Sequence, residues 1–157
     1  MTFYDSKAHF GTVSMVTSTL GPNDPELGER RTVGNGEYVF VYNAGNTSIA
    51  TGDICTISGV SGYSVTKSTT TGVDFAVGVC YHESFTSAQY GWLLTRGFGK
   101  VNMHADNSVA AGGLLVCGDL GKAFNQTVST GIPSRPIGKA VSAIASGGSG
   151  TAFLSVW

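Results

Sequence analysis

The stretch Tyr38-Val39-Phe40-Val41-Tyr42 decides the fold class of this chain. All five residues are β-branched or aromatic, and such side chains pack well on a pleated strand. The run ends at Asn43-Ala44-Gly45-Asn46, a sequence typical of a tight turn. We therefore predict a β-strand followed by a turn at this point.

Similar runs follow along the chain. Residues 49–57 place a Gly-Asp turn before an alternating segment, and the glycines of residues 91–101 allow a bend or a bulge. Residues 63–65 and 75–80 also favour strands, whereas a helical pattern at 106–111 is too short to be stable alone. We predict an all-β protein, either a small β-barrel or a sandwich-like domain.

The composition supports short strands joined by glycine turns. Of 157 residues, 23 are glycine, 41% are hydrophobic and 12% are charged, against about 25% charged in average proteins. Because the cores of protein–protein interfaces exclude charge, this surface fits large contacts with other proteins. An under-charged monomer is the alternative interpretation.

Charge and hydropathy also bear on partners and location. The net charge is −1 and basic residues form no run, so we expect no nucleic-acid partner. No stretch approaches the roughly 18 apolar residues of a membrane span, so we expect no membrane partner. The N-terminus does not have the pattern of a signal peptide. With three cysteines in no framework spacing, we expect free thiols and synthesis in a reducing cytoplasm.

Two regions differ in pattern. Residues 1–36 hold Pro22, Pro25 and few periodic apolar positions, so we interpret them as an extended N-terminal arm. A loosely packed strand and loop is the alternative. Residues 37–157 form the predicted β domain.

An internal echo runs through the β domain at an offset of 60 residues. It predicts two duplicated β units, at about residues 49–101 and 109–157, although abundant glycine leaves chance as an alternative. The matched pairs are Gly52-Asp53-Ile54-Cys55 with Gly112-Gly113-Leu114-Leu115, Val77-Gly78-Val79-Cys80 with Ile137-Gly138-Lys139-Ala140, and Trp92-Leu93-Leu94-Thr95 with Ala152-Phe153-Leu154-Ser155.

The search for reactive groups centres on Cys80 and His82, which would share one face of a strand. No metal-binding spacing accompanies them, and the echo aligns each cysteine with a small or aliphatic residue, so we predict that the cysteines pack in the core. The three histidines are isolated from carboxylate pairs. Asp53, Asp74, Asp106 and Asp119 lie in apparent turns, where Asp caps the backbone. We therefore predict no enzyme activity, no cofactor and no metal.

These features together resemble the capsid decoration, or cement, proteins of tailed bacteriophages. The polar arm, the run from Gly36 to Asn43, and the recurring pattern Ala/Thr-x-Gly-Asp/Gly before an alternating segment carry the resemblance, as do Ala76-Val77-Gly78-Val79 and Pro136-Ile137-Gly138-Lys139-Ala140. The resemblance covers most of residues 36–157 and is one of style, without a diagnostic motif.

The resemblance implies a structural protein on the outer capsid surface of the virion. Its partners would be the major capsid protein and other copies of itself, in a homotrimer, with the N-terminal arm pairing with capsid strands. Arg30 and Arg31 would then pair with capsid carboxylates, and Phe3 and Tyr4 would contribute to the same interface. The terminal Trp157 would either seal the barrel or meet a neighbouring subunit.

Two other functions are weighed against this one. The first is a head-fibre or tail-associated module that binds host carbohydrate through exposed aromatic residues such as Tyr63, Tyr81, Tyr90 or Trp92. The second is a small β-barrel enzyme or ligand carrier, which would require a pocket with convergent polar groups.

Overall fold

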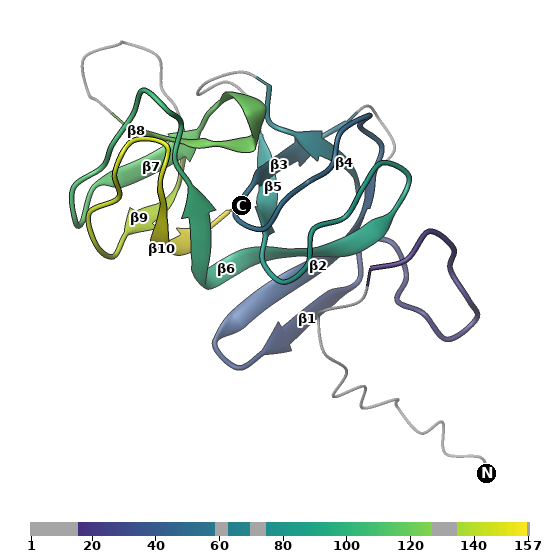
Figure 1. Cartoon of the computed structure of the whole chain (residues 1–157). Helices are drawn as coiled ribbons and strands as arrows, with labels where there is room; N and C mark the ends of the chain where they lie inside the picture. Colours follow the sequence, from purple (N-terminus) through teal and green to yellow (C-terminus); the bar gives the residue numbers. More distant parts are fainter. Residues whose placement is uncertain (1–15, 59–62, 70–74, 127–134, 157) are drawn as a thin grey trace.

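The computed structural model describes residues 16–58, 63–69, 75–126 and 135–156. These residues form an all-β fold, which confirms the predicted fold class (Figure 1). The expected strands are present, and residues 106–111 contain no helix. The elements are β1 (Arg30–Val33), β2 (Gly36–Asn43), β3 (Ile54–Ile57), β4 (Ser64–Lys67), β5 (Ala76–Cys80), β6 (Tyr90–Asn102), β7 (Leu114–Cys117), the 3₁₀ turn η1 (Asp119–Gly121), β8 (Ala123–Asn125), β9 (Pro136–Ala140) and β10 (Ser149–Ser155).

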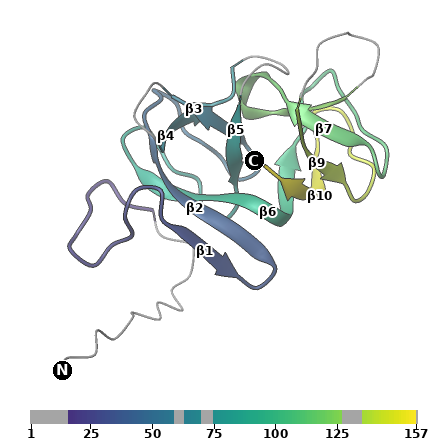
Figure 2. The ribbon, with the colours of Figure 1, turned by 180° about the vertical axis from the view of Figure 1, so that it is seen from behind.

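All ten strands belong to one sheet in the order β1-β2-β4-β3-β5-β6-β10-β9-β7-β8. An additional pairing of β2 with β6 closes the strands β2-β4-β3-β5-β6 into a ring. On the other side of β6, the strands β10, β9, β7 and β8 curl back, and a single parallel bridge between Met103 and Ala123 completes a second ring. The molecule is thus not a clean barrel but a sandwich-like domain made of two fused rings (Figures 1 and 2).

Strand β6 is shared by the two rings. It is 13 residues long, and its first half pairs with β2 and β5 while its second half pairs with β10. Gly97 has a φ of 123°, and a Cβ there would meet the backbone of Asn35 and Gly36. Only glycine adopts this conformation without strain, and the register between β2 and β6 shifts at the same point, between Glu37 and Tyr38. The strand therefore changes partners at a glycine.

The two rings repeat the same backbone pairing. We define unit 1 as residues 36–95 and unit 2 as residues 96–155, and bonds in unit 1 recur in unit 2. The amide of Gly52 donates to the carbonyl of Cys80, and the amide of Gly112 donates to the carbonyl of Ala140 in the same way. The amide of Cys80 donates to the carbonyl of Asp53, as the amide of Ala140 does to the carbonyl of Gly113. The amide of Asp53 donates to the carbonyl of Ala50, as the amide of Gly113 does to the carbonyl of Ala110. The β3–β5 and β7–β9 pairs even carry a register shift at the same place, after Cys55 and after Leu115.

The register corrects the third of the sequence matches. Cys80 stands opposite Leu93, and its counterpart Ala140 stands opposite Ala152, 59 residues after Leu93. The connection between β9 and β10 is therefore one residue shorter than its counterpart. The parallel pairing of Asn43 with Val65 also recurs as Met103 with Ala123, so the structural repeat begins at β2 and β6, earlier than residues 49 and 109.

Two hydrophobic clusters fill the fold. One lies inside the ring of unit 1 and contains eight buried residues: Val39, Val41, Ile49, Cys55, Val65, Cys80, Phe85 and Leu93. The other joins the interior of unit 2, including Val101, Leu115 and Ile144, to the outer face of unit 1, including Tyr38, Ile54 and Leu94. Unit 1 is therefore apolar on both faces of its sheet, and its outer face packs against unit 2.

The segment before unit 1 is partly built into the sheet. Residues 30–33, near the end of the predicted arm, form β1 and pair with β2, and the amide of Thr17 donates to the carbonyl of Tyr90. Residues 1–15 lie outside the described residues. Among the described residues, no helix is long and apolar enough to cross a membrane.

Candidate functional site: polar clusters and interaction surfaces

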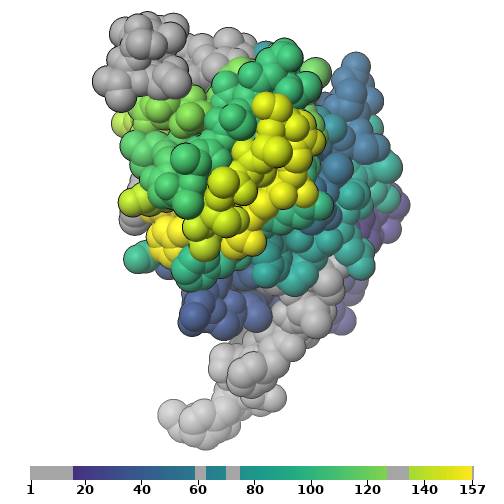
Figure 3. All heavy atoms as spheres, turned by 60° about the vertical axis from the view of Figure 1, so that its left-hand side comes forward, coloured from purple at the N-terminus to yellow at the C-terminus, as the bar shows by residue number. Residues whose placement is uncertain are grey.

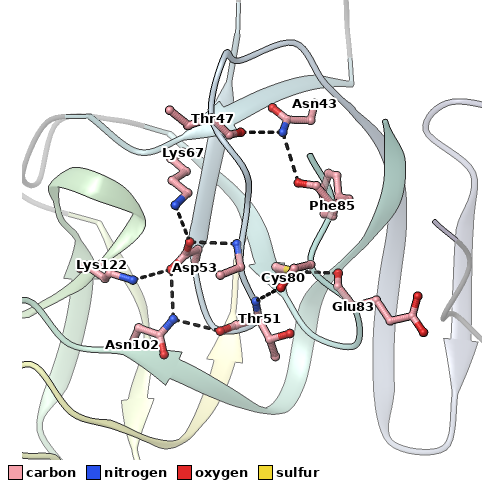
Figure 4. A network of polar contacts seen from close by, with 12 residues as sticks. Asn43, Thr47, Thr51, Asp53, Lys67, Cys80, Glu83, Phe85, Asn102 and Lys122 are labelled. Atoms are coloured by element: carbon pink, nitrogen blue, oxygen red, sulfur yellow. Dashed lines mark hydrogen bonds and ion pairs between the residues drawn. The ribbon is translucent and has the colours of Figure 1, made fainter. Parts of the chain in front are cut away.

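A fully buried carboxylate lies where the two units meet, in the turn before β3 (Figure 4). The side chain of Asp53 is fully buried. Its Oδ1 accepts from Lys122 Nζ at 2.7 Å and Asn102 Nδ2 at 3.0 Å, and its Oδ2 accepts from Lys67 Nζ at 2.9 Å and the amide of Ala50 at 3.0 Å. Four donors from four segments thus converge on one carboxylate.

Asp53 is held as an anion by these contacts. Burial by itself would raise its pKa, but the hydrogen bonds from Lys122, Asn102, Lys67 and the Ala50 amide outweigh burial and lower the pKa. The carboxylate caps its turn as predicted, through the Ala50 amide. The ion pairs were not predicted, because Lys122 is 69 residues away. With all its lone pairs engaged, this carboxylate is suited to fixing the two units together.

Cys80 and His82 do not form the pair considered from the sequence. Strand β5 ends at Cys80, which is buried, whereas His82 is exposed. The Cys80 thiol donates to the carbonyl of Glu83 at 3.2 Å, and burial raises its pKa to about 12. The His82 ring packs edge-on against Tyr81, and the partial burial of the ring lowers its pKa. In the described ranges, no group of three or more His, Cys, Asp or Glu side chains is arranged to hold a metal ion.

His104 is not isolated from carboxylates, contrary to the sequence analysis. Its Nε2 lies 3.3 Å from Asp119 Oδ1, its Nδ1 accepts from the amide of Asp106 at 3.3 Å, and its ring stacks on Phe124 at 4.7 Å. Asp106 is only two residues away, so the spacing offered a local signal. These contacts hold together the loop after β6 and the turn η1.

The residues predicted to form a capsid or subunit interface lie in different surroundings. Arg30 is exposed on β1, which stands at one end of the strand order. Arg31 is engaged within the chain, because its Nε donates to Glu29 Oε1 at 2.7 Å and its guanidinium lies 4.9 Å from the ring centre of Trp92. Phe3, Tyr4 and Trp157 lie outside the described residues.

The aromatic residues considered for carbohydrate binding are mostly covered. Trp92 is 3% exposed, which corrects the expectation that it is available at the surface. Tyr81 and Tyr90 are half-buried and pack against the core. Tyr63 is exposed, with its ring against Gly28. A sugar platform would therefore have to be built without Trp92.

Comparisons with known proteins place the fold. No protein-family model matches the chain, and no curated protein matches it. Among solved structures, the chain is similar to the N-terminal base of the head fibre protein gp8.5 of bacteriophage phi29, with a TM-score of 0.54 and 14% sequence identity. The match covers 75% of this chain and 92% of that chain. The two proteins share a fold.

Proposed function

We propose that this chain is a structural protein of a bacteriophage virion that sits on the outer surface of the head and bridges neighbouring subunits of the major capsid protein. The observation that carries the proposal is the fold shared with the base of a phage head fibre over 92% of that chain. The low-charge, glycine-rich composition and the resemblance to decoration proteins support the same assignment.

The capsid contact is made by the segment before unit 1 in this proposal. Within the described residues, β1 has one neighbour in the strand order, β2, so its other edge is available there to a further strand. Strand addition at such an edge supplies backbone hydrogen bonds without requiring a particular sequence. Arg30 faces solvent beside this edge and pairs with a capsid carboxylate. Arg31 serves the fold instead, as the cation over Trp92.

The bridging effect depends on several weak contacts acting together. Copies of the chain associate with one another, as a homotrimer by the resemblance, and each copy adds its own capsid contact at high effective concentration. In this role the chain needs no catalysis, cofactor, nucleic acid or membrane. Cys55, Cys80 and Cys117 are all buried and none forms a disulfide, which suits synthesis in the reducing cytoplasm of a bacterial host.

The test uses heads of the phage that encodes the chain, prepared without it. Purified chain added to such heads is expected to co-sediment with them and to raise the temperature at which they release DNA. Arg30→Glu is expected to weaken co-sedimentation, whereas Asp106→Asn, which changes an exposed charge elsewhere on the molecule, is not. Failure of the wild-type chain to bind heads contradicts the proposal.

The base of a head fibre is the second candidate, and the same structural match favours it. A fibre base also binds heads, but it anchors a longer fibre and does not reinforce the shell. Binding without any change in the DNA-release temperature would therefore identify a fibre base. A glycan array with purified chain tests the carbohydrate role that such a fibre could have, and a cement protein is expected to show no sugar preference.

A further inference from the structure

A strip of exposed side chains crosses four strands of unit 2. Phe98 of β6 stands directly opposite Phe153 of β10, Phe153 stands opposite Lys139 of β9, and Lys139 stands opposite Leu114 of β7. Phe98 is 56% exposed, Leu114 44% and Phe153 39%. The two phenylalanine rings meet edge to face at 5.2 Å. We call this surface the outer strip, and contiguous apolar strips of this kind mark interaction sites.

The same strip is buried in unit 1. By the pairing described above, the counterparts of Phe98, Phe153, Lys139 and Leu114 are four residues of the central core: Tyr38, Leu94, Val79 and Ile54. Each of the four is at most 5% exposed, because unit 2 packs over them. One face of a repeated sheet is therefore covered by a neighbouring unit in one copy of the repeat and open in the other.

The outer strip carries basic side chains. Lys139 lies within it, and Lys100, opposite Thr151, is exposed next to it. The four strands that carry it, β6, β7, β9 and β10, contain no acidic residue. A surface that covers the strip should therefore combine apolar and acidic side chains.

The chain itself carries such a surface at its other end. Residues 20–29, which we call the acidic loop, contain Asp24, Glu26 and Glu29 and no basic residue. Glu29 is engaged by Arg31 within the chain, so the acidic character of this surface comes from Asp24 and Glu26. Leu20 and Leu27 are exposed on the acidic loop, as is Glu26. The acidic loop and unit 2 lie at opposite ends of the molecule (Figures 1 and 2), and Figure 3 turns the end with unit 2 toward the viewer. One copy therefore cannot cover its own strip.

We propose that the outer strip of unit 2 binds the acidic loop of a second copy of this chain. The contact uses a different surface on each copy, and such contacts build rings when the rotation closes. If the outer strip bound the outer strip of a second copy, Lys139 and Lys100 would approach the same two lysines of that copy, and their like charges would repel. The inference rests on the self-association included in the proposed function and does not depend on capsid binding.

The first test is light scattering of the full-length chain after size exclusion. The wild type is expected to form a closed oligomer, and the double variant Phe98→Ser/Phe153→Ser a monomer with an unchanged circular dichroism spectrum. Leu120→Asn, which removes another exposed apolar side chain away from the strip, is the matched control and stays oligomeric. A wild type that is monomeric at about 100 µM, far above the Kd of stable complexes, overturns the inference, as does an oligomeric double variant.

The second test identifies the partner surface by charge reversal. Lys139→Glu and Glu26→Lys are each expected to weaken self-association about tenfold at low salt, and the double variant is expected to restore it. A double variant weaker than both single variants overturns the assignment of the acidic loop. Head binding by a monomeric wild type would refute this inference and leave the proposed capsid binding standing. An oligomer with the expected variant behaviour that binds no heads would support this inference and refute the proposed capsid binding.

Discussion

Units 1 and 2 share one backbone pattern but use their side chains differently. The interior of unit 1 holds Phe85 and Val39, where the counterparts in unit 2 are Ile144 and Gly99. The outer face of unit 1 is buried beneath unit 2, whereas that of unit 2 exposes Phe98 and Phe153. The comparison teaches that the hydrogen-bond pattern sets the strand arrangement, while side-chain volume and charge decide which unit acts as core and which presents a surface.

The largest expected effect tests whether unit 1 is the core of the molecule. Phe85→Ala removes a fully buried aromatic side chain from the interior of unit 1 and should lower the free energy of unfolding by about 4 kcal/mol. Its counterpart Ile144→Ala should cost less, about 3 kcal/mol, because fewer atoms are lost. Urea unfolding of both variants measures the difference. A larger loss for Ile144→Ala would contradict the expectation that the interior of unit 1 contributes more to stability at this position than the interior of unit 2.

The next effect concerns the ion pairs of Asp53, which join the two units. Unit 2 has no equivalent carboxylate, because Gly113 stands where unit 1 has Asp53. Asp53→Asn should destabilise the fold by about 3 kcal/mol at pH 7, since it leaves Lys67 and Lys122 without their anion. Asp106→Asn, whose side chain is exposed, is the control and should have little effect.

The buried carboxylate of Asp53 also predicts that the stability of the fold depends on pH. The folded pKa of Asp53 lies below its ordinary value of 3.8, so its stabilisation is complete above that value and is lost as the pH falls through the lower folded pKa. Unfolding curves between pH 7 and pH 2 should therefore show a smaller acid loss for Asp53→Asn than for the wild type. Equal acid losses would mean that Asp53 keeps its ordinary pKa in the folded state.

A smaller effect tests the equivalence of the units at a glycine. Gly78 and Gly138 occupy the same place beside the register shift, and a Cβ on either would meet the backbone of the next strand, at the carbonyl oxygen of Leu94 or of Phe153. Alanine at either position should cost about 2 kcal/mol in thermal unfolding. Gly34→Asn, at an open turn with positive φ that Asn tolerates, should change little. A cost at one glycine alone would show that the two bulges differ.

The smallest effect separates the two arginines before unit 1. Arg31→Ala removes the cation over Trp92 and the ion pair with Glu29, and should cost about 1 kcal/mol with a change in tryptophan fluorescence. Arg30→Ala should leave stability and fluorescence unchanged, because Arg30 is exposed. If both variants behave alike, the contact of Arg31 with Trp92 makes no measurable contribution to the stability of the fold.

Much of the fold could be predicted from the sequence. The β-branched and aromatic runs of residues 38–42 and 91–101 lie in β2 and β6, because strand formation follows from local side-chain shape and alternation. The glycine-marked turns at Gly52 and Gly112 were also readable, since both need a positive φ. The roles of the candidate site residues were harder to predict from the sequence. Arg30 and Arg31 are adjacent and chemically alike, and only the neighbouring Trp92 makes them different.

The sequence by itself determined that this protein is all-β, with a pattern that echoes at about 60 residues, because strands and turns depend on local chemistry. Only the tertiary structure decided which echoed positions are buried. Tyr38 and Phe98 occupy equivalent strand positions with similar side chains, yet one is core and the other is surface. The reason is physical: burial depends on what packs across a face, and a face is covered by residues far away in the chain, as Asp53 is held by Lys122.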